Sequence, residues 1–475
     1  MLGGTVWTSI SALSDKIIGI VTIAFLARLL EPKDFGTVAV CMILIGIVST
    51  FSDIGFQSAI IQRKGSINRA ASTALCITVI LSIVNFGILF MAAKPLSILY
   101  GDEAIVNIAR VLSINLVIGS FTRVHNFLLS RELQFGRKAA CETVPSAVYG
   151  LVAIPSAFAG YGVWSIVFGE LAKSTTRSIL LLVVSRWKAT LQFDMKIAKE
   201  LVSYGKHVMF NNLLNFGSIN IDNAVVGKYL GLTSLSFYKI AYNAAALPGE
   251  ILYLILGRVL VPAFAKVQDD LEVVTRQYLK VVEYSSYIFL PVFFGLFMLA
   301  PEFINLLYGP KWNPAVPLFR ALLLFGLANV LMMFSNCLLL STGRPAILPK
   351  ITLARIILVI LLLLTLMRIS LLALCIGIST VQMALLFVQL GYIRRKYHVP
   401  IKAVFASIQT PAFFSLIMGA SLYGAIKMMD GVVLPTALGL AVKVSIGSFV
   451  YMSLFTIFKR DTIQQFLLLR HETGR

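Results

Sequence analysis

The chain has 475 residues, of which 58% are hydrophobic and only 13% are charged, and its mean hydropathy is +0.87. A soluble chain carries about 25% charged residues, so this composition excludes an ordinary soluble protein. The formal net charge of +20 would suit a nucleic-acid-binding protein, but the distribution of that charge along the chain argues against this class.

Apolar segments of about 20 residues, the length that crosses a bilayer, recur along the whole chain. We therefore predict an all-α polytopic membrane protein with about fourteen transmembrane helices. In chain order they cover approximately residues 4–28, 36–60, 72–94, 104–129, 142–160, 162–185, 203–227, 235–258, 281–300, 317–340, 350–368, 371–392, 404–425 and 433–457. Polar residues between them, as in 186–202 and 259–280, are expected to be connectors.

Lysine and arginine are divided unevenly between the two sets of connections. If the N-terminus is cytoplasmic, the cytoplasmic connections and tail hold 25 of these residues and the opposite connections hold seven. Positive residues concentrate in cytoplasmic loops, so we predict that both termini are cytoplasmic. The basic residues would then face anionic lipids, and no nucleic-acid partner is expected.

Residues that carry enzyme chemistry are missing from the sequence patterns. The five cysteines lie in or beside apolar spans without a CxxC pair, which indicates neither a disulfide framework nor a zinc site. There is also no HExxH, no GxxxxGK[ST] and no plausible Cys–His–Asp constellation. We expect no catalytic residue, no metal and no cofactor. No signal peptide is visible at the start of the chain.

Two parts of the chain match each other at a nearly constant offset. RLLEPKDFG at residues 28–36 has an outline similar to KYLGLTSLS at residues 228–236, and LYG occurs at both 99–101 and 307–309. At an offset of 210, Arg110 matches Arg320 and Asn126 matches Asn336. These matches predict an internal duplication.

Each repeat would contain six helices, and an even number places the start of both repeats on the same side of the membrane. Such parallel repeats enclose a cavity near the midplane. We predict an N-terminal six-helix bundle at 1–197, a second six-helix bundle at 198–402, and two extra helices with a cytoplasmic tail at 403–475.

Charged side chains inside the predicted spans should face protein or water, because each costs about 2.5–3.5 kcal/mol at the bilayer centre. Several share a helix face: Glu170, Lys173 and Arg177 are three and four residues apart. We predict that these faces line a hydrated, cationic cavity suited to a phosphate or pyrophosphate group. In the alternative interpretation, the same groups form buried pairs that join neighbouring helices.

The candidate residues fall into three sets. The predicted substrate-binding cations are Arg123, Lys173, Arg177 and Lys239. The candidates for coupling to a proton or sodium ion are Asp15, Lys16, Glu170, Asp222 and Glu250. A polar stripe along one helix comprises His207, Asn211, Asn215 and Ser218 and leads to Asp222.

Three stretches resemble a known family: ARLLEPKDFGTVAV, FSDIGFQSAIIQRK and LYGPKWNPAVPLFRALL. They are similar to the polysaccharide transporter family, the Wzx-type flippases of the multidrug/oligosaccharidyl-lipid/polysaccharide superfamily. The resemblance implies fourteen helices in two six-helix bundles plus two. It also implies a cargo, an undecaprenyl-pyrophosphate-linked oligosaccharide, which moves from the cytoplasmic to the periplasmic leaflet by alternating access during exopolysaccharide, lipopolysaccharide O-antigen or colanic-acid synthesis.

Other functions stay open at this point. A multidrug or cation antiporter of the same superfamily would need a more acidic cavity, and a lipid II flippase is disfavoured by the three stretches. A membrane polysaccharide polymerase would need a large periplasmic loop, whereas the longest such segment here is about 302–316. We expect a monomer, with a polysaccharide polymerase as a candidate partner.

Overall fold

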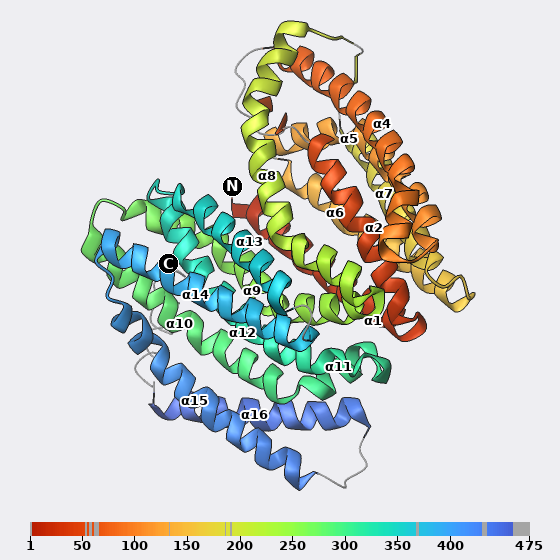
Figure 1. Cartoon of the computed structure of the whole chain (residues 1–475). Coiled ribbons are helices and arrows are strands. Elements are labelled where there is room, and N and C mark those ends of the chain that lie inside the picture. The colour runs from red at the N-terminus through yellow and green to blue at the C-terminus, as the bar shows by residue number, and fades with distance from the viewer. Residues whose placement is uncertain are drawn as a thin grey trace. The chain divides into compact units, whose positions relative to one another are not determined.

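A computed structural model describes residues 2–52, 55–56, 59–60, 66–132, 134–185, 187–190, 192–366, 370–429 and 435–458. Within these ranges the chain forms helices and no β-strand (Figure 1), which confirms the predicted all-α membrane fold. In lipid, a helix satisfies its own backbone hydrogen bonds, so long apolar runs adopt this conformation.

The helices differ widely in length, and several are longer than a bilayer crossing requires. They are α1 Leu2–Leu29, α2 Pro32–Ser52, α4 Ile67–Tyr100, α5 Ala104–Arg131, α6 Phe135–Phe158, α7 Trp164–Val184, α8 Met195–Leu230, α9 Leu232–Lys266, α10 Leu271–Met298, α11 Ala300–Tyr308, the 3-10 helix η1 Pro310–Trp312, α12 Ala315–Ser341, α13 Ile347–Leu366, α14 Leu371–Tyr397, α15 Ile401–Met428 and α16 Thr436–Phe458.

Ten helices in the described ranges are long and apolar enough to cross a membrane. The other long helices are α1, α6, α7 and α8, with 28, 24, 21 and 36 residues. At 1.5 Å per residue each of them also exceeds the roughly 30 Å of a hydrocarbon core. Three of these four helices, α1, α7 and α8, carry most of the predicted cavity residues, several of which are charged. The number of fourteen spans stays a prediction.

The chain divides by its contacts into two compact units. Unit 1 comprises Met1–Lys239 and Pro349–Leu374, and unit 2 comprises Ile240–Leu348 and Cys375–Arg475. Helix α8 belongs to unit 1 because it packs against α2 and α4. In unit 2, α10 and α15 run side by side (Figure 1). A division by contacts does not test a division by sequence repeats. The repeat boundaries at residues 197 and 402 therefore stay a prediction.

Helices extend into both predicted connectors. Helix α8 begins at Met195, α9 continues to Lys266, and α10 begins at Leu271. Asp194 caps α8 by accepting hydrogen bonds from two backbone amides of its first turn, and Asp270 caps α10 in the same way. Capping supplies partners for amides that the helix leaves unpaired, so both helices extend beyond their apolar segments.

The predicted duplication recurs in details of the structure. After the turn that follows α1, helix α2 begins at Pro32, and after the turn that follows α8, helix α9 begins at Leu232, an offset of 200. Gly101 after α4 and Gly309 after α11 both have positive φ, at 67° and 96°. Arginines 110 and 320 each donate from Nε to a phenylalanine carbonyl, of Phe90 and Phe297 respectively.

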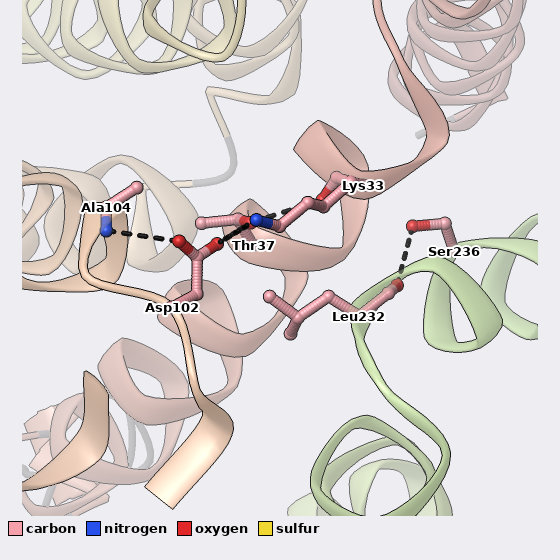
Figure 2. Close-up of polar contacts among 6 residues, drawn as sticks. All are labelled: Lys33, Thr37, Asp102, Ala104, Leu232 and Ser236. Carbon is pink, nitrogen blue, oxygen red and sulfur yellow. Dashed lines mark hydrogen bonds and ion pairs between the residues drawn. The ribbon is translucent and has the colours of Figure 1, made fainter. Parts of the chain in front are cut away.

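At one end of unit 1, the turn between α4 and α5 holds the start of α2 (Figure 2). The Asp102 carboxylate accepts a hydrogen bond from Thr37 Oγ1 at 2.8 Å, and its other oxygen accepts from the backbone amide of Ala104 at 3.2 Å. Lys33 Nζ lies 3.7 Å from the same carboxylate. Lys33 and Thr37, at the end of the RLLEPKDFG stretch and just after it, are therefore anchored to the turn between α4 and α5.

The two turns that the sequence pairs as equivalents also contact each other. A β-carbon at Gly36 would lie 2.0 Å from the carbonyl oxygen of Leu232, so α2 and the start of α9 pack backbone to backbone there. Ser236 Oγ donates to the carbonyl oxygens of Leu232, at 3.0 Å, and of Pro32 (Figure 2 draws the former). These contacts close this end of unit 1 between the first and second repeats.

Candidate functional site

Unit 1 contains a polar cavity of about 450 Å³ inside its membrane-spanning helices. Ten of its thirteen lining residues are polar, and they come from α2, α5, α7 and α8. Polar surface at membrane depth is stable where it is hydrated, so this space is expected to hold water or a polar ligand.

The cavity carries positive charge. Arg123 of α5 and Arg177 of α7 both line it, and they are the charged residues among the described part of its lining. Thr122 and Ser178 hydroxyls lie 3.3 Å apart and join α5 to α7 beside the two arginines. Two guanidinium groups on packed helices can bind an anion with two phosphate groups, because each presents several parallel N–H donors.

Carboxamide side chains complete the cavity. Asn115 and Asn126 project from α5, and Asn212 projects from α8. The Oδ1 atom of Asn115 is buried and has no hydrogen-bond partner among the described residues. A buried acceptor without a partner is costly, so a ligand donor such as a hydroxyl group would stabilise it.

The predicted substrate cations separate into two places. Arg123 and Arg177 share the cavity, whereas Lys173 and Lys239 are not among its lining residues. Lys173 Nζ lies 5.7 Å from the ring centroid of Tyr149 on α6. The charges of Lys173 and Lys239 both act on the carboxylate of Glu170, which forms a second charged group in unit 1. A substrate role for these two lysines stays a prediction.

Asp222 is the most buried of the predicted ion-coupling residues, with 1% of its surface exposed. It accepts a hydrogen bond from the Tyr238 hydroxyl at 2.6 Å and another from the Asn223 amide at 2.8 Å. The positive charge of Arg355 on α13 also acts on this carboxylate. Asp222 is thus held between α8, α9 and α13.

The other ion-coupling candidates have different surroundings. Asp15 accepts a hydrogen bond from Ser146 Oγ, which joins α1 to α6. Lys16 on α1 is half-buried, and Glu250 on α9 is exposed. The ion-coupling roles of these residues stay predictions.

The predicted polar stripe on α8 runs from an exposed to a buried environment. Asn211 and Asn215 are exposed, whereas Ser218 is buried beside the fully buried Asp222. The side chain of His207 lies outside the described residues. The cavity is lined instead by Asn212, which the stripe did not include.

The corresponding helices of the second half, α12 and α14 in unit 2, pair their amides with each other. Gln382 Nε2 donates to Asn329 Oδ1 at 2.6 Å, and Gln389 Nε2 donates to Asn336 Oδ1 at 2.7 Å. Asn126, which matches Asn336 in the repeat, lines the cavity instead. Under the predicted duplication, equivalent positions would thus line a cavity in the first repeat and form a closed amide contact in the second.

Fold and polar interior together define a polytopic membrane protein with the fold of the lipid II flippase MurJ. The inward closed structure of that flippase matches with a TM-score of 0.76 at 16% identity, over 96% of this chain and 100% of the other. An inward-facing multidrug resistance MATE family transporter of the MOP superfamily matches with a TM-score of 0.64 at 17% identity, over 82% and 98%. At such identities the likeness concerns the fold.

The sequence comparison identifies the family. The polysaccharide biosynthesis protein family model matches residues 25–317, and the chain belongs to this family, as the three stretches predicted. It is 26% identical to the teichuronic acid biosynthesis protein TuaB of Bacillus subtilis (strain 168), over 72% of each chain. It is also 26% identical to the lipopolysaccharide biosynthesis protein WzxC of Escherichia coli (strain K12), over 69% of this chain and 67% of WzxC.

A third relative is the succinoglycan biosynthesis transport protein ExoT of Rhizobium meliloti (strain 1021). It is 25% identical over 67% of this chain and 64% of ExoT. These three relatives are named for three different polymers, one of them an acid by name, and one relative is named as a transport protein.

Proposed function

We propose that the protein is a flippase for undecaprenyl-pyrophosphate-linked oligosaccharides. It would move them by alternating access from the cytoplasmic to the periplasmic leaflet of the bacterial inner membrane, for synthesis of an exopolysaccharide or O-antigen-like polymer. The observation that carries this proposal is the cavity in unit 1, which Arg123 and Arg177 line together with eight uncharged polar residues among those that the structure describes. Membership of the polysaccharide biosynthesis family supports it.

In this proposal the two arginines bind the pyrophosphate. The asparagines at 115, 126 and 212 then bind hydroxyl or amide groups of the first sugar. The cavity separates these polar groups from lipid, while the polyprenyl chain stays outside it in the apolar phase. The work of the protein is binding and movement of the cargo, so no bond is made or broken.

Return of the empty carrier needs a driving force, and we propose that a proton or sodium ion supplies it through Glu170 or Asp222. Glu170 interacts with lysines of α7 and α9, and Asp222 interacts with Tyr238 and Arg355. Adding a proton or a cation to either carboxylate would weaken its attraction to these neighbours. The helices that each carboxylate joins could then separate.

The test is replacement of both cavity arginines. The variant Arg123→Gln/Arg177→Gln keeps hydrogen-bonding side chains but removes both charges, so polymer export and flipping of a pyrophosphate-linked sugar lipid in proteoliposomes should be abolished. Arg110→Gln, a membrane arginine outside the cavity, is the matched control and should retain transport. Lys173→Ala/Arg177→Ala is expected to abolish export as well.

Undiminished flipping by the Arg123→Gln/Arg177→Gln variant at normal expression would reject the proposal. The same vesicles distinguish two related functions. Proton-dependent efflux of a cationic dye would identify a drug antiporter, and a preference for lipid II over a polymer repeat unit would identify a lipid II flippase. We expect neither activity, and we expect the protein to act as a monomer beside a separate polymerase.

A further inference from the structure

A second pocket, in unit 2, differs in chemistry from the cavity of unit 1. It has a volume of about 390 Å³, and nine of its twelve lining residues are apolar. They come from α10, α12 and α14 and include Phe293, Phe294 and Leu327. An apolar space of this size suits a hydrocarbon chain and not a sugar.

The mouth of this pocket is also apolar. Phe297 of α10, Leu324 of α12 and Ile376 of α14 line it and are 45%, 46% and 52% exposed. In a membrane-spanning bundle, large apolar side chains exposed on neighbouring helices are in contact with lipid chains. The pocket is therefore accessible to a lipid chain from the bilayer.

One charged residue, Arg320, lies in the lining of this pocket. Its Nε donates to the carbonyl oxygen of Phe297 at 3.1 Å, and its guanidinium carbon lies 5.6 Å from the centroid of the Phe297 ring. These two contacts fix the plane of the guanidinium group. Its two terminal nitrogens have no partner among the described residues, so they can donate together to one phosphate.

No other group in the lining is placed to donate to that phosphate. Ser379 Oγ already donates to the carbonyl oxygen of Ala321 at 2.8 Å, and Thr380 Oγ1 donates to that of Ile376 at 2.9 Å. Among the described residues, the lining contains no acidic side chain that would neutralise Arg320. The pocket thus combines one positive charge with an apolar channel, which is the complement of a lipid with one negative phosphate.

The lining residues also lie at one end of the helices. Helix α10 ends at Met298, α12 begins at Ala315 and α14 begins at Leu371, so Arg320 is about 8 Å from the start of its helix. An arginine at this depth reaches the headgroup region. In the predicted orientation this end faces the periplasm.

We propose that this pocket binds an anionic phospholipid of the outer leaflet, with its phosphate on Arg320 and one acyl chain between α10, α12 and α14. The bound lipid would fill the apolar space and neutralise a charge that is otherwise expensive in the membrane. This site is separate from the cavity in unit 1 and does not depend on the proposed cargo.

The test uses the full chain in nanodiscs of phosphatidylglycerol or phosphatidylcholine, with a photo-reactive amino acid in place of Ile376 at the pocket mouth. Mass spectrometry of the cross-linked peptide identifies the attached lipid. We expect a phosphatidylglycerol adduct that falls about tenfold in Arg320→Gln, because a charge-assisted hydrogen bond is lost. Arg110→Gln, which removes an arginine with the same local contacts in unit 1, should leave the adduct unchanged.

A second pair of variants covers the case in which Arg320→Gln does not fold. Leu324→Trp fills the pocket mouth without a change of charge and should remove the adduct. Leu340→Trp is its control, since Leu340 lies elsewhere on α12, is outside the pocket lining, and is 48% exposed. Equal adducts in Arg320→Gln and the parent, or equal adducts in the two nanodiscs, would overturn the proposal. So would an adduct with the mass of a prenyl-linked sugar.

Discussion

Gly36 makes a contact that no larger residue could make without movement of the backbone. Its α-carbon faces the carbonyl oxygen of Leu232, and the nearest flexible atom, Ser236 Oγ, would still lie 2.9 Å from an added β-carbon. The obstacle is the carbonyl of another helix, which cannot rotate away like a side chain. The space at residue 36 therefore sets how closely α2 and α9 approach.

The variant Gly36→Ala should destabilise this closed end. Overpacking at a tight contact costs about 1–3 kcal/mol, more than the roughly 0.5–1 kcal/mol that alanine gains over glycine in a helix. We expect a lower melting temperature in detergent. Gly87→Ala in α4 is the control, because nothing lies within 4 Å of its β-carbon, and it should be neutral or stabilising. Equal melting temperatures for the two variants would contradict this account.

Among single residues, charge was a better guide to the cavity than polarity. Arg123 and Arg177 were predicted to face a cavity, because a charge inside a span has few other places to lie, and both line it. Asn212 was missed in favour of Asn211, one residue away and about 100° around the helix. Residue spacing groups the polar positions of α8 into a stripe, but the packing of α8 against α2 and α4 decides its rotation. Asn115 has no charge, but it lies eight residues before Arg123 and eleven before Asn126, on the same face of α5, a signal that the prediction did not use.

At the scale of elements, α12 and α14 are joined by two asparagine–glutamine pairs that are seven residues apart on each helix. Seven residues are close to two helical turns, so both pairs lie on the same side of each helix. The Oε1 atoms of both glutamines are buried and have no partner among the described residues. Each pair therefore depends on a single good hydrogen bond.

Replacing one member of a pair should cost more than replacing both. Asn336→Leu or Gln389→Leu alone leaves a buried amide without its partner, at about 1–3 kcal/mol, whereas the double variant removes both polar groups. We expect the melting temperature to fall in each single variant and to recover partly in the double variant. Thr365→Val, at an exposed hydroxyl of α13, is the control. Additive losses in the double variant would show that the pair is not the source of the effect.

Element boundaries were predicted well where the sequence contains a strong helix end and less well elsewhere. The turn between α8 and α9 lies inside KYLGLTSLS at residues 228–236, the stretch that matches residues 28–36, and Gly231 in it has a φ of 88°. The predicted starts of α8 and α10 are eight and ten residues too late, because each helix begins before its apolar segment does. Asp194 and Asp270 continue these helices into polar sequence by capping. The Lys33–Asp102 contact joins residues far apart in the chain, which no local pattern could predict.

At the scale of the whole molecule, the excess of basic residues predicts the orientation in the membrane. Alkaline phosphatase is active only outside the cytoplasm, so an insertion in the turn at residues 101–103 should be active and one at residues 343–346 should be inactive. Both turns join consecutive long helices, α4 to α5 and α12 to α13. The measurement is phosphatase activity normalised to expression. The reverse pattern would invert the predicted topology and place the Arg320 pocket in the cytoplasmic leaflet.

The cavity of unit 1 has a size that bears on how selective such a flippase can be. A space of about 450 Å³ is within the range that encloses a drug-sized molecule, and a repeat unit of several sugars is larger than this. If the arginines hold the pyrophosphate, the asparagines reach only the sugar next to it. The protein would then discriminate by the reducing-end sugar and tolerate variation further along the glycan. Cells that change the distal sugars of their polymer would not need a new flippase, whereas a change of the first sugar would require one.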